Sequence, residues 1–184
     1  MELLSFSETH YSSHIKLIIS YDDTSELHEL PTVKAHRCKV RQIQGPSLTL
    51  MRDNSLDASK CFVCGPENNI GLKLKFRLDG DICRSEFTPK VEHCGYDDVT
   101  HGGIIFSVLD DVMANWIYLK GIRAYTAKCD IRYKDNLKIG TKVNVEGQCI
   151  KRRNRLILME GKMVREDTGD TVAETQASFM IDNT

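Results

Sequence analysis

The sequence predicts an α+β domain in which an antiparallel sheet wraps around one long, apolar helix. Three observations predict it. Apolar and polar residues alternate over residues 72–78 with the period of a half-buried strand, and Asp79-Gly80 favours a tight hairpin turn after it. An apolar stretch over residues 103–120 has the length of a helix and ends at Gly121. Strand-like patterns then occupy the remainder of the chain.

The elements follow from these patterns in chain order. Residues 82–87 return antiparallel to the first strand, and Pro89 stops them. Apolar residues occupy nearly every face of the helix, so we expect it to be largely enclosed. Four strands follow at residues 123–136, 141–153, 156–166 and 171–181. Their short connections predict an antiparallel meander in which each strand pairs with the next.

The first 60 residues have a different character. An apolar run at residues 15–19 and loose alternation over residues 33–50 indicate a few strands, and a polar stretch from residue 52 to 60 has the composition of a junction. We therefore expect a β-rich N-terminal extension of unknown role over residues 1–60, and a single domain over residues 61–184.

Composition and charge narrow the classes of function. The 184 residues are 41% hydrophobic and 28% charged, with a net charge of −1, which is typical of a globular protein without a general attraction to nucleic acid or anionic membranes. No targeting segment or run of roughly 20 apolar residues is evident. The seven cysteines are an odd number and lie partly in expected strands, which favours reduced thiols. We expect a cytoplasmic protein with no nucleic-acid or membrane partner.

Three motifs follow one another along the chain: the segment Cys61-Phe-Val-Cys-Gly-Pro-Glu-Asn-Asn-Ile-Gly-Leu72, then Gly95-Tyr96, then His101-Gly102-Gly103 with Asp110 nine residues after the histidine. Together they resemble the hot-dog-fold acyl-CoA thioesterases of the phenylacetyl-CoA type. The resemblance covers residues 61–182. It implies a hot-dog fold, an acyl-CoA thioester as substrate with no other cofactor, and a homodimer or dimer of dimers with the substrate tunnel between protomers.

The resemblance also implies roles for the residues around the helix start. Asp110 is the expected general base or nucleophile, and the backbone N–H of Gly102 is the expected donor to the thioester oxygen. Gly103 lets the substrate approach the main chain. His101 would hydrogen-bond the carbonyl region or orient the loop. The alternative for His101 is a helix-entry residue that satisfies a backbone group.

Physical chemistry supports a special role for Asp110. It lies two turns into an apolar helix, so desolvation is expected to raise its pKa unless donors offset it. The alternative is a buried carboxylate that merely fixes the position of the helix. Its neighbour Asp111 points about 100° away and is interpreted as a structural or solvent-facing acid. The resemblance further implies that the hydroxyl of Thr126 positions water or Asp110 from the opposite protomer; an ordinary strand threonine is the alternative.

Two further features bear on ligands. The basic residues Lys151, Arg152 and Arg153 suit the phosphates of coenzyme A, although a basic hairpin turn is also a common device against edge pairing. Cys61 and Cys64 have zinc-ligand spacing, with Cys83, Cys94 and His93 as further candidates. Structural zinc normally needs a second close pair, so we expect no metal.

Acyl-CoA hydrolysis is therefore the expected function. A non-catalytic acyl-CoA sensor on the same fold is the alternative, because some similar enzymes carry an asparagine six residues before the histidine, where this chain has Gly95. A dehydratase or isomerase on the same fold ranks last, because this chain lacks the histidine-containing helix motif that is usual in those enzymes.

Overall fold

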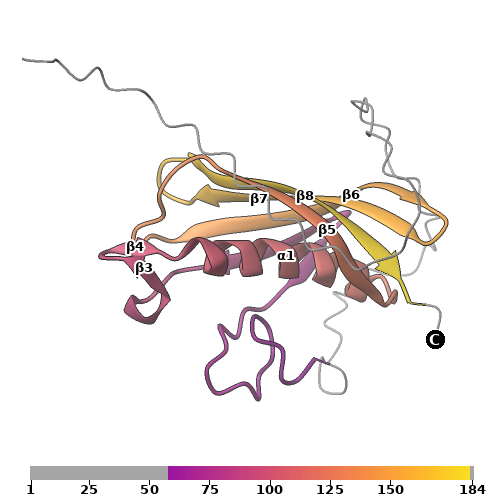
Figure 1. The fold of residues 1–184 in the computed structure, drawn as a ribbon, viewed down its shortest axis with the longest axis horizontal. Helices are drawn as coiled ribbons and strands as arrows, with labels where there is room; N and C mark the ends of the chain where they lie inside the picture. The colour runs from indigo at the N-terminus through magenta and orange to yellow at the C-terminus, as the bar shows by residue number, and fades with distance from the viewer. Residues whose placement is uncertain (1–57, 183–184) are drawn as a thin grey trace, which may run out of the picture.

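The computed structural model describes residues 58–182, and Figure 1 shows one long helix lying along a curved antiparallel sheet. The sheet has six strands in the order β1-β2-β6-β7-β8-β5. Its strands are β1 (Arg77–Asp79), β2 (Ile82–Phe87), β5 (Ala124–Tyr133), β6 (Val143–Arg153), β7 (Leu156–Arg165) and β8 (Thr171–Ile181). The expected N-terminal extension falls almost entirely outside the described residues.

The predicted hairpin is present, but its first strand is shorter than expected. Gly80 makes the turn with φ of +62°, and β2 occupies the predicted residues 82–87. Strand β1 contains only three residues. Residues 72–76 fall outside the sheet because their backbone donors bond elsewhere: the N–H groups of Leu72 and Leu74 donate to the carbonyls of Phe62 and Val63. The alternation therefore marks a segment held by the preceding loop.

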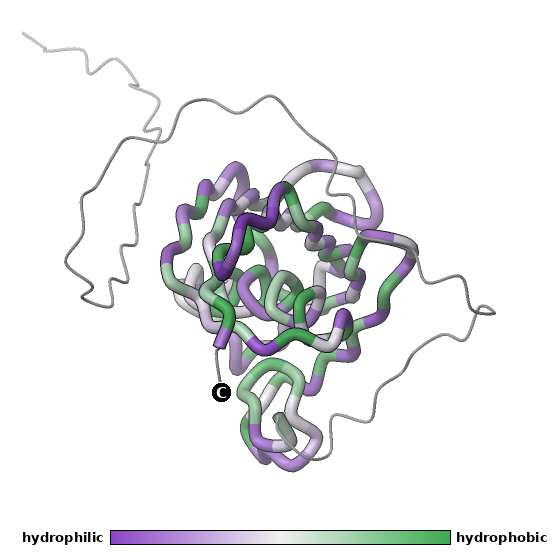
Figure 2. The backbone as a smooth tube through the Cα atoms, turned by 90° about the vertical axis from the view of Figure 1, so that its right-hand side faces the viewer, coloured by the Kyte–Doolittle hydropathy of each residue, from purple (hydrophilic) through white to green (hydrophobic). Residues whose placement is uncertain are grey.

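The helix α1 (Gly102–Leu119) is confirmed, whereas its expected enclosure is only partly correct. Gly121 follows with φ of +77°, the left-handed conformation that ends helices. Eight helix residues are buried, including Leu109 and Met113. The sheet curves over one side of the helix, as Figure 2 shows, so the other side carries partly exposed residues. By length and composition α1 would also suit a membrane span, but core helices pass the same test.

Two paired glycines lie where the sheet meets the helix. Gly147 on β6 pairs with Gly161 on β7. A Cβ at position 147 would lie 3.1 Å from the backbone carbonyl of Val112, whereas a Cβ at position 161 would lie 2.9 Å from a methyl group of Thr175 and 3.5 Å from a methyl group of Leu109. The missing side chain at Gly147 therefore lets the helix backbone approach the sheet directly. The helix residues that these two glycines face, Leu109, Val112 and Met113, are fully buried.

The predicted meander is wrong at one position. Strand β5 pairs with β8 at one edge of the sheet, and β6 pairs with β2 and β7, so β5 and β6 are not neighbours. The segment between them crosses the end of the sheet, anchored by buried Leu137, whose carbonyl accepts from Thr100 N–H at 2.8 Å. The segment between β5 and β6 is long enough to cross the end of the sheet. The sequence alone does not reveal that it does so.

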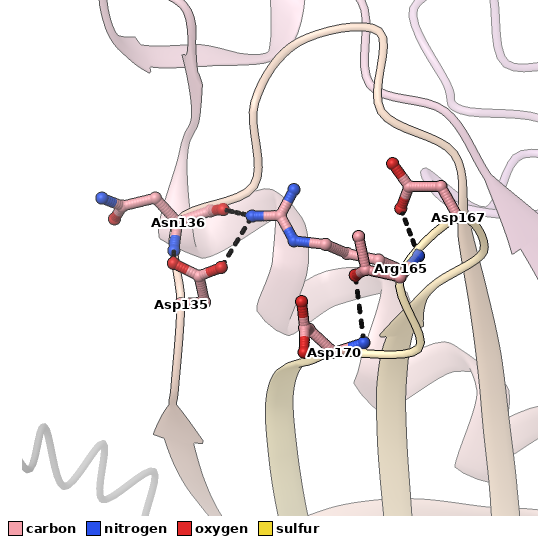
Figure 3. A network of polar contacts seen from close by, with 6 residues as sticks. Asp135, Asn136, Arg165, Asp167 and Asp170 are labelled. Atoms are coloured by element: carbon pink, nitrogen blue, oxygen red, sulfur yellow. Dashed lines mark hydrogen bonds and ion pairs between the residues drawn. The ribbon is translucent and has the colours of Figure 1, made fainter.

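Arg165 holds the crossing segment in place. Its guanidinium donates to Asp135 Oδ2 at 2.8 Å and to the backbone carbonyl of Asn136, as Figure 3 shows. The same figure shows the adjoining β7–β8 turn, in which Asp167 accepts from the N–H of Thr168 at 2.8 Å. Guanidinium groups suit such a role because they donate several hydrogen bonds in a fixed geometry. The connection is therefore fixed to the sheet it crosses.

We predict that Gly147→Ala destabilises the fold. The added methyl group would press on the backbone of Val112, which cannot rotate away, so the free energy of unfolding should fall by about 1–3 kcal/mol. Urea unfolding followed by circular dichroism measures it. Gln148→Ala, at the neighbouring exposed position, should change the value by less than about 0.5 kcal/mol. Equal effects of the two substitutions would contradict the proposed contact.

Candidate active site

His101 lies at the start of the helix and satisfies a backbone group there, as the alternative interpretation of this residue expected. It is the N-cap of α1, and its Nδ1 accepts a hydrogen bond from the N–H of Gly103 at 2.9 Å. Its own N–H donates to the carbonyl of His93 at 2.8 Å. A Cβ at Gly103 would lie 3.0 Å from His101 Nδ1. The ring therefore satisfies one free donor of the helix start, and Gly103 leaves room for it.

Gly102 is the first residue of the helix. Its carbonyl accepts from the hydroxyl of Tyr133 at 2.8 Å, which ties the helix start to the end of β5. Its N–H donates to no group within residues 58–182. An N–H in the first helical turn, at the positive end of the helix dipole, is suited to hold a developing negative charge. Gly102 therefore has the free donor that the resemblance expects there.

Asp110 and Thr126 are in direct contact. The hydroxyl of Thr126 on β5 donates to Asp110 Oδ1 at 2.8 Å. Burial raises the pKa of Asp110, and the Thr126 hydrogen bond partly offsets it, while the nearby Cys61 raises the pKa further. The predicted partnership exists, but within one chain rather than from an opposite protomer. The result is a partly desolvated carboxylate held in one orientation by a hydroxyl group.

The Gly102 N–H and the Asp110 carboxylate are far apart in one chain. The two residues are eight positions apart on one α-helix, which corresponds to about 12 Å along the helix axis. A carbonyl oxygen and the atom that attacks its carbon lie within a few ångströms of each other in the reaction. One copy of the chain therefore does not bring the two expected catalytic groups together.

Asp111 is not solvent-facing. It lies on the other side of α1 from the Thr126 contact, where Cys61 Sγ approaches Asp111 Oδ1 at 3.6 Å. Asn115, one turn along, donates to Asp111 Oδ2 at 3.0 Å. Burial, followed by the neighbouring Cys61, raises the pKa of Asp111 to about 8. The residue is structural in the sense that it joins α1 to the segment carrying Cys61 and Cys64.

The basic residues Lys151, Arg152 and Arg153 lie apart from Asp110. All three are exposed at the end of β6, before the turn to β7. Thr126 and Arg152 lie on one row across the sheet with β8 and β7 between them, which puts their backbones about 14 Å apart. A hollow of about 760 Å³ on the sheet contains none of the expected site residues in its lining.

Sequence reasoning missed Tyr133, Asn115 and the position of Asp111. Tyr133 falls in the segment that carries the resemblance, but nothing in its spacing points to the carbonyl of Gly102. The signal for Asn115 is its place one turn after Asp111 on an apolar helix, since a buried amide needs partners. Cys83, Cys94 and His93 do not join the cluster that Cys61 and Cys64 form with Asp111.

Comparison with known proteins gives the same fold. Residues 98–172 match the family model of the thioesterase superfamily. No curated protein matches the chain in sequence. Among solved structures, the PaaI protein from the phenylacetic acid degradation operon of E. coli is 18% identical, with a TM-score of 0.57 over 61% of this chain and 81% of that one.

Two further structures agree. Thioesterase superfamily member 2 from zebrafish is 15% identical, with a TM-score of 0.58 over 68% of this chain and 94% of that one. A hypothetical thioesterase from Streptococcus pneumoniae TIGR4, solved with coenzyme A, is 15% identical, with a TM-score of 0.56 over 59% of this chain and 85% of that one. The described residues therefore form a hot-dog-fold domain, and residues 98–172 carry the sequence pattern of the thioesterase superfamily.

Proposed function

We propose that the protein hydrolyses an acyl-CoA thioester to a carboxylic acid and free coenzyme A. The observation that carries the proposal is the Asp110–Thr126 pair, a half-buried carboxylate with one oriented hydroxyl donor on a thioesterase-superfamily fold. Carboxylates kept in such surroundings usually have a chemical task. Among the described residues, Cys61, Cys64, Cys83, Cys94 and Cys129 form no disulfide, which suits the reducing cytoplasm that we propose for the protein.

Similar structures support both the ligand and the residue pair. The pneumococcal protein was solved with coenzyme A, and a Streptococcus mutans protein with 16% identity was solved with acetyl-CoA. Two variants of the pneumococcal protein, with an aspartate and a threonine replaced by alanine, have also been solved. Those two positions are 16 residues apart, the same separation as Asp110 and Thr126. The pair is thus the feature that we carry over to this chain.

Asp110 would act in one of two ways. As a general base it accepts a proton from water while the water oxygen attacks the thioester carbon. As a nucleophile its oxygen attacks that carbon, and water then cleaves the mixed anhydride. In both cases the carbonyl oxygen gains negative charge, which the Gly102 N–H would stabilise, and coenzyme A leaves as a thiolate. Single turnover in ¹⁸O-labelled water separates the two, because only the nucleophilic route leaves the label in Asp110.

A complete site requires a second protomer. Because Gly102 and Asp110 of one chain are about 12 Å apart along α1, we propose that Gly102 of one protomer faces Asp110 and Thr126 of its partner. A two-fold axis then makes two equal sites per homodimer. Within the described residues, β5 pairs only with β8, so its other edge is available for a partner strand. A dimer of dimers would keep the same sites.

The other expected residues have supporting roles in this proposal. His101 and Gly103 shape the helix start, where the ring of His101 occupies one donor and leaves the Gly102 N–H for the substrate. Lys151, Arg152 and Arg153 would bind phosphates of coenzyme A, whose length separates its phosphates from the thioester. Their exposed position is compatible with such a contact.

We predict that Asp110→Asn lowers kcat by about 10²–10⁴-fold, because the amide can neither accept the proton nor attack the carbon. The measurement is thiol release from short, aromatic and long acyl-CoAs. Gln148→Ala serves as the matched control on an exposed strand position and should retain wild-type turnover. Full activity of Asp110→Asn, in a protein with unchanged circular dichroism, would refute the assignment.

We predict that Gly102→Pro lowers kcat by about 10²–10³-fold, the usual effect of losing one oxyanion donor. Proline lacks the N–H and is well tolerated at the first helical position. His101, with φ of −59° and ψ of 132°, already has the conformation that a following proline requires. Gly102→Ala is the control, because it keeps the N–H and its Cβ would lie 3.4 Å from the Tyr133 hydroxyl. Equal losses in the two variants would argue for steric obstruction instead.

The shared site predicts complementation between inactive variants. In a heterodimer of Asp110→Asn and Gly102→Pro chains, purified through two different tags, one site keeps both groups and the other has neither. Turnover should therefore return to about half of the wild-type value per dimer. If both groups of one chain served the same site, every site would lack one group, and the heterodimer would be as inactive as its parents.

A second candidate function is a non-catalytic acyl-CoA sensor. It is favoured by Gly95, where a Cβ would lie 3.0 Å from the Cα of His101. The chain passes too close there to accept an asparagine without moving, so any hydrogen bond from that position is lost. Tight binding of an acyl-CoA without thiol release would identify the sensor, whereas steady thiol release would exclude it.

A further inference from the structure

We propose that Cys61, Cys64 and Asp111 form a binding site for a divalent transition metal ion, with Zn²⁺ as the preferred ion. One ligand atom from each residue lies within 4.8 Å of the others, and all three residues are half-buried. The two cysteines come from the loop that precedes β1, and the aspartate comes from the middle of α1. The site shares no residue with the Asp110–Thr126 pair, although it lies next to Asp110 on α1, and it does not depend on the proposed thioesterase activity.

The distances suit tetrahedral zinc. Zinc binds sulfur at about 2.3 Å and carboxylate oxygen at about 2.0–2.2 Å, so a sulfur and an oxygen on one tetrahedral ion lie about 3.5 Å apart. Cys61 Sγ and Asp111 Oδ1 are 3.6 Å apart. Two thiolates with one carboxylate favour zinc over magnesium or calcium, which prefer oxygen ligands. Three protein ligands leave a fourth position for water.

The cysteine loop is shaped for a thiolate. The N–H of Cys64 points at Cys61 Sγ at 3.5 Å, and such N–H donors stabilise a negatively charged sulfur. Gly65 closes the turn by donating to the carbonyl of Cys61 at 2.9 Å. A Cβ at Gly65 would lie 2.4 Å from the nitrogen of Cys61, so no other residue fits this turn. The two sulfurs are therefore held on one side of a rigid loop.

The carboxylate is oriented by a second residue. Asn115 donates to Asp111 Oδ2 at 3.0 Å and to the Asp111 backbone carbonyl at 2.9 Å. This contact leaves Oδ1 directed at Cys61. Residues that bind metals are commonly oriented by such an outer hydrogen bond. Asn115 is itself buried, and its amide also lies 3.9 Å from Cys64 Sγ.

The charges of the cluster also suit a cation. Two thiols and a carboxyl group gather in half-buried surroundings, and within residues 58–182 no lysine or arginine forms an ion pair with Asp111. Acidic groups at such distances must hold protons or share a positive ion. A divalent metal neutralises most of this charge when all three groups bind it.

The segment that carries the two cysteines has little buried apolar surface of its own. Residues 58–71 contain no helix or strand, and Figures 1 and 2 show this loop on the side of α1 away from the sheet. Val63 is its one fully buried apolar residue, whereas Ile70 is 83% exposed. Small segments without a core of their own are often stabilised by metal ions. The metal would therefore fasten the cysteine loop to α1.

The sequence led to the opposite expectation, because a second cysteine pair is missing. The third ligand is instead a helix residue 50 positions after Cys61, next to the expected catalytic aspartate. A ligand set that combines a local pair with one distant carboxylate has no recognisable spacing. Only the packing of the loop on α1 brings it together.

The test is metal binding by the full-length protein, without any activity measurement. Elemental analysis of protein produced with added zinc should give about one Zn²⁺ per chain. After removal of zinc, titration with Co²⁺ under reducing, anaerobic conditions should give the visible absorption of tetrahedral cobalt and the near-ultraviolet band of cobalt–thiolate bonds. Competition with a chromophoric chelator gives the Kd.

Variants identify the ligands. Cys61→Ser and Cys64→Ser should each weaken Zn²⁺ binding by more than about 100-fold, and Asp111→Asn and Asn115→Ala by about 10–100-fold. Cys94→Ser, at an exposed cysteine outside the cluster, is the matched control and should bind like the wild type. Circular dichroism checks that each variant folds.

Three results would overturn the proposal, and each can be read from the wild-type protein or the control. The first is less than stoichiometric zinc and no thiolate band with cobalt when the thiols are reduced. The second is an equal loss of binding in Cys94→Ser. The third is a Cys61–Cys64 disulfide in metal-free protein purified without reductant, together with no zinc uptake after reduction, which would identify a redox pair instead.

Discussion

The contact between α1 and the inner face of the sheet is the constraint on which the other features depend. Gly147 has no side chain where the helix crosses β6, so the helix backbone itself lies against the sheet there. This close approach fixes the rotation of α1 about its axis. Because rotation and depth are fixed, polar residues in the middle of the helix are carried into partly desolvated positions that they would otherwise avoid.

Asp110 and Asp111 show how the rotation of α1 about its axis determines the surroundings of each carboxylate. The two residues are adjacent, yet a turn of about 100° sends them to different surroundings. Asp110 meets a hydroxyl of β5, which lowers the cost of its charge, whereas Asp111 meets two thiols and an amide. Burial raises the pKa of both, with different partners in each case. One apolar helix thus supports two separate polar sites.

The geometry of a helix also limits what one chain can do. An N-terminal donor and a carboxylate two turns later share a helix but are separated by about 12 Å of its axis. Such a pair is useful only when a second helix runs antiparallel and brings the complementary end alongside. The proposed dimer therefore follows from the separation of Gly102 and Asp110 along α1, and the unpaired edge of β5 is compatible with it.

Local patterns in the sequence determined most of the secondary structure. The helix, its end at Gly121, the turn at Gly80 and four strands were predictable because backbone conformation and side-chain period are local properties. The pairing of β5 with β8 was not, since a crossing segment and a hairpin connection differ only in what the segment contacts. The short length of β1 was not predictable either, because it depends on a tertiary contact: the N–H groups of Leu72 and Leu74, which precede β1, bond to an earlier loop.

The same division holds for the site. The resemblance of the sequence to hot-dog-fold thioesterases pointed to His101, Gly102 and Asp110, and to Thr126 as a partner. Only the tertiary structure decided that Thr126 meets Asp110 within one chain, that His101 caps the helix, and that Asp111 joins Cys61 and Cys64. Spacing along a chain fixes which residues share a helix face, whereas contacts between distant segments depend on how the helix rotates against the sheet and the loop.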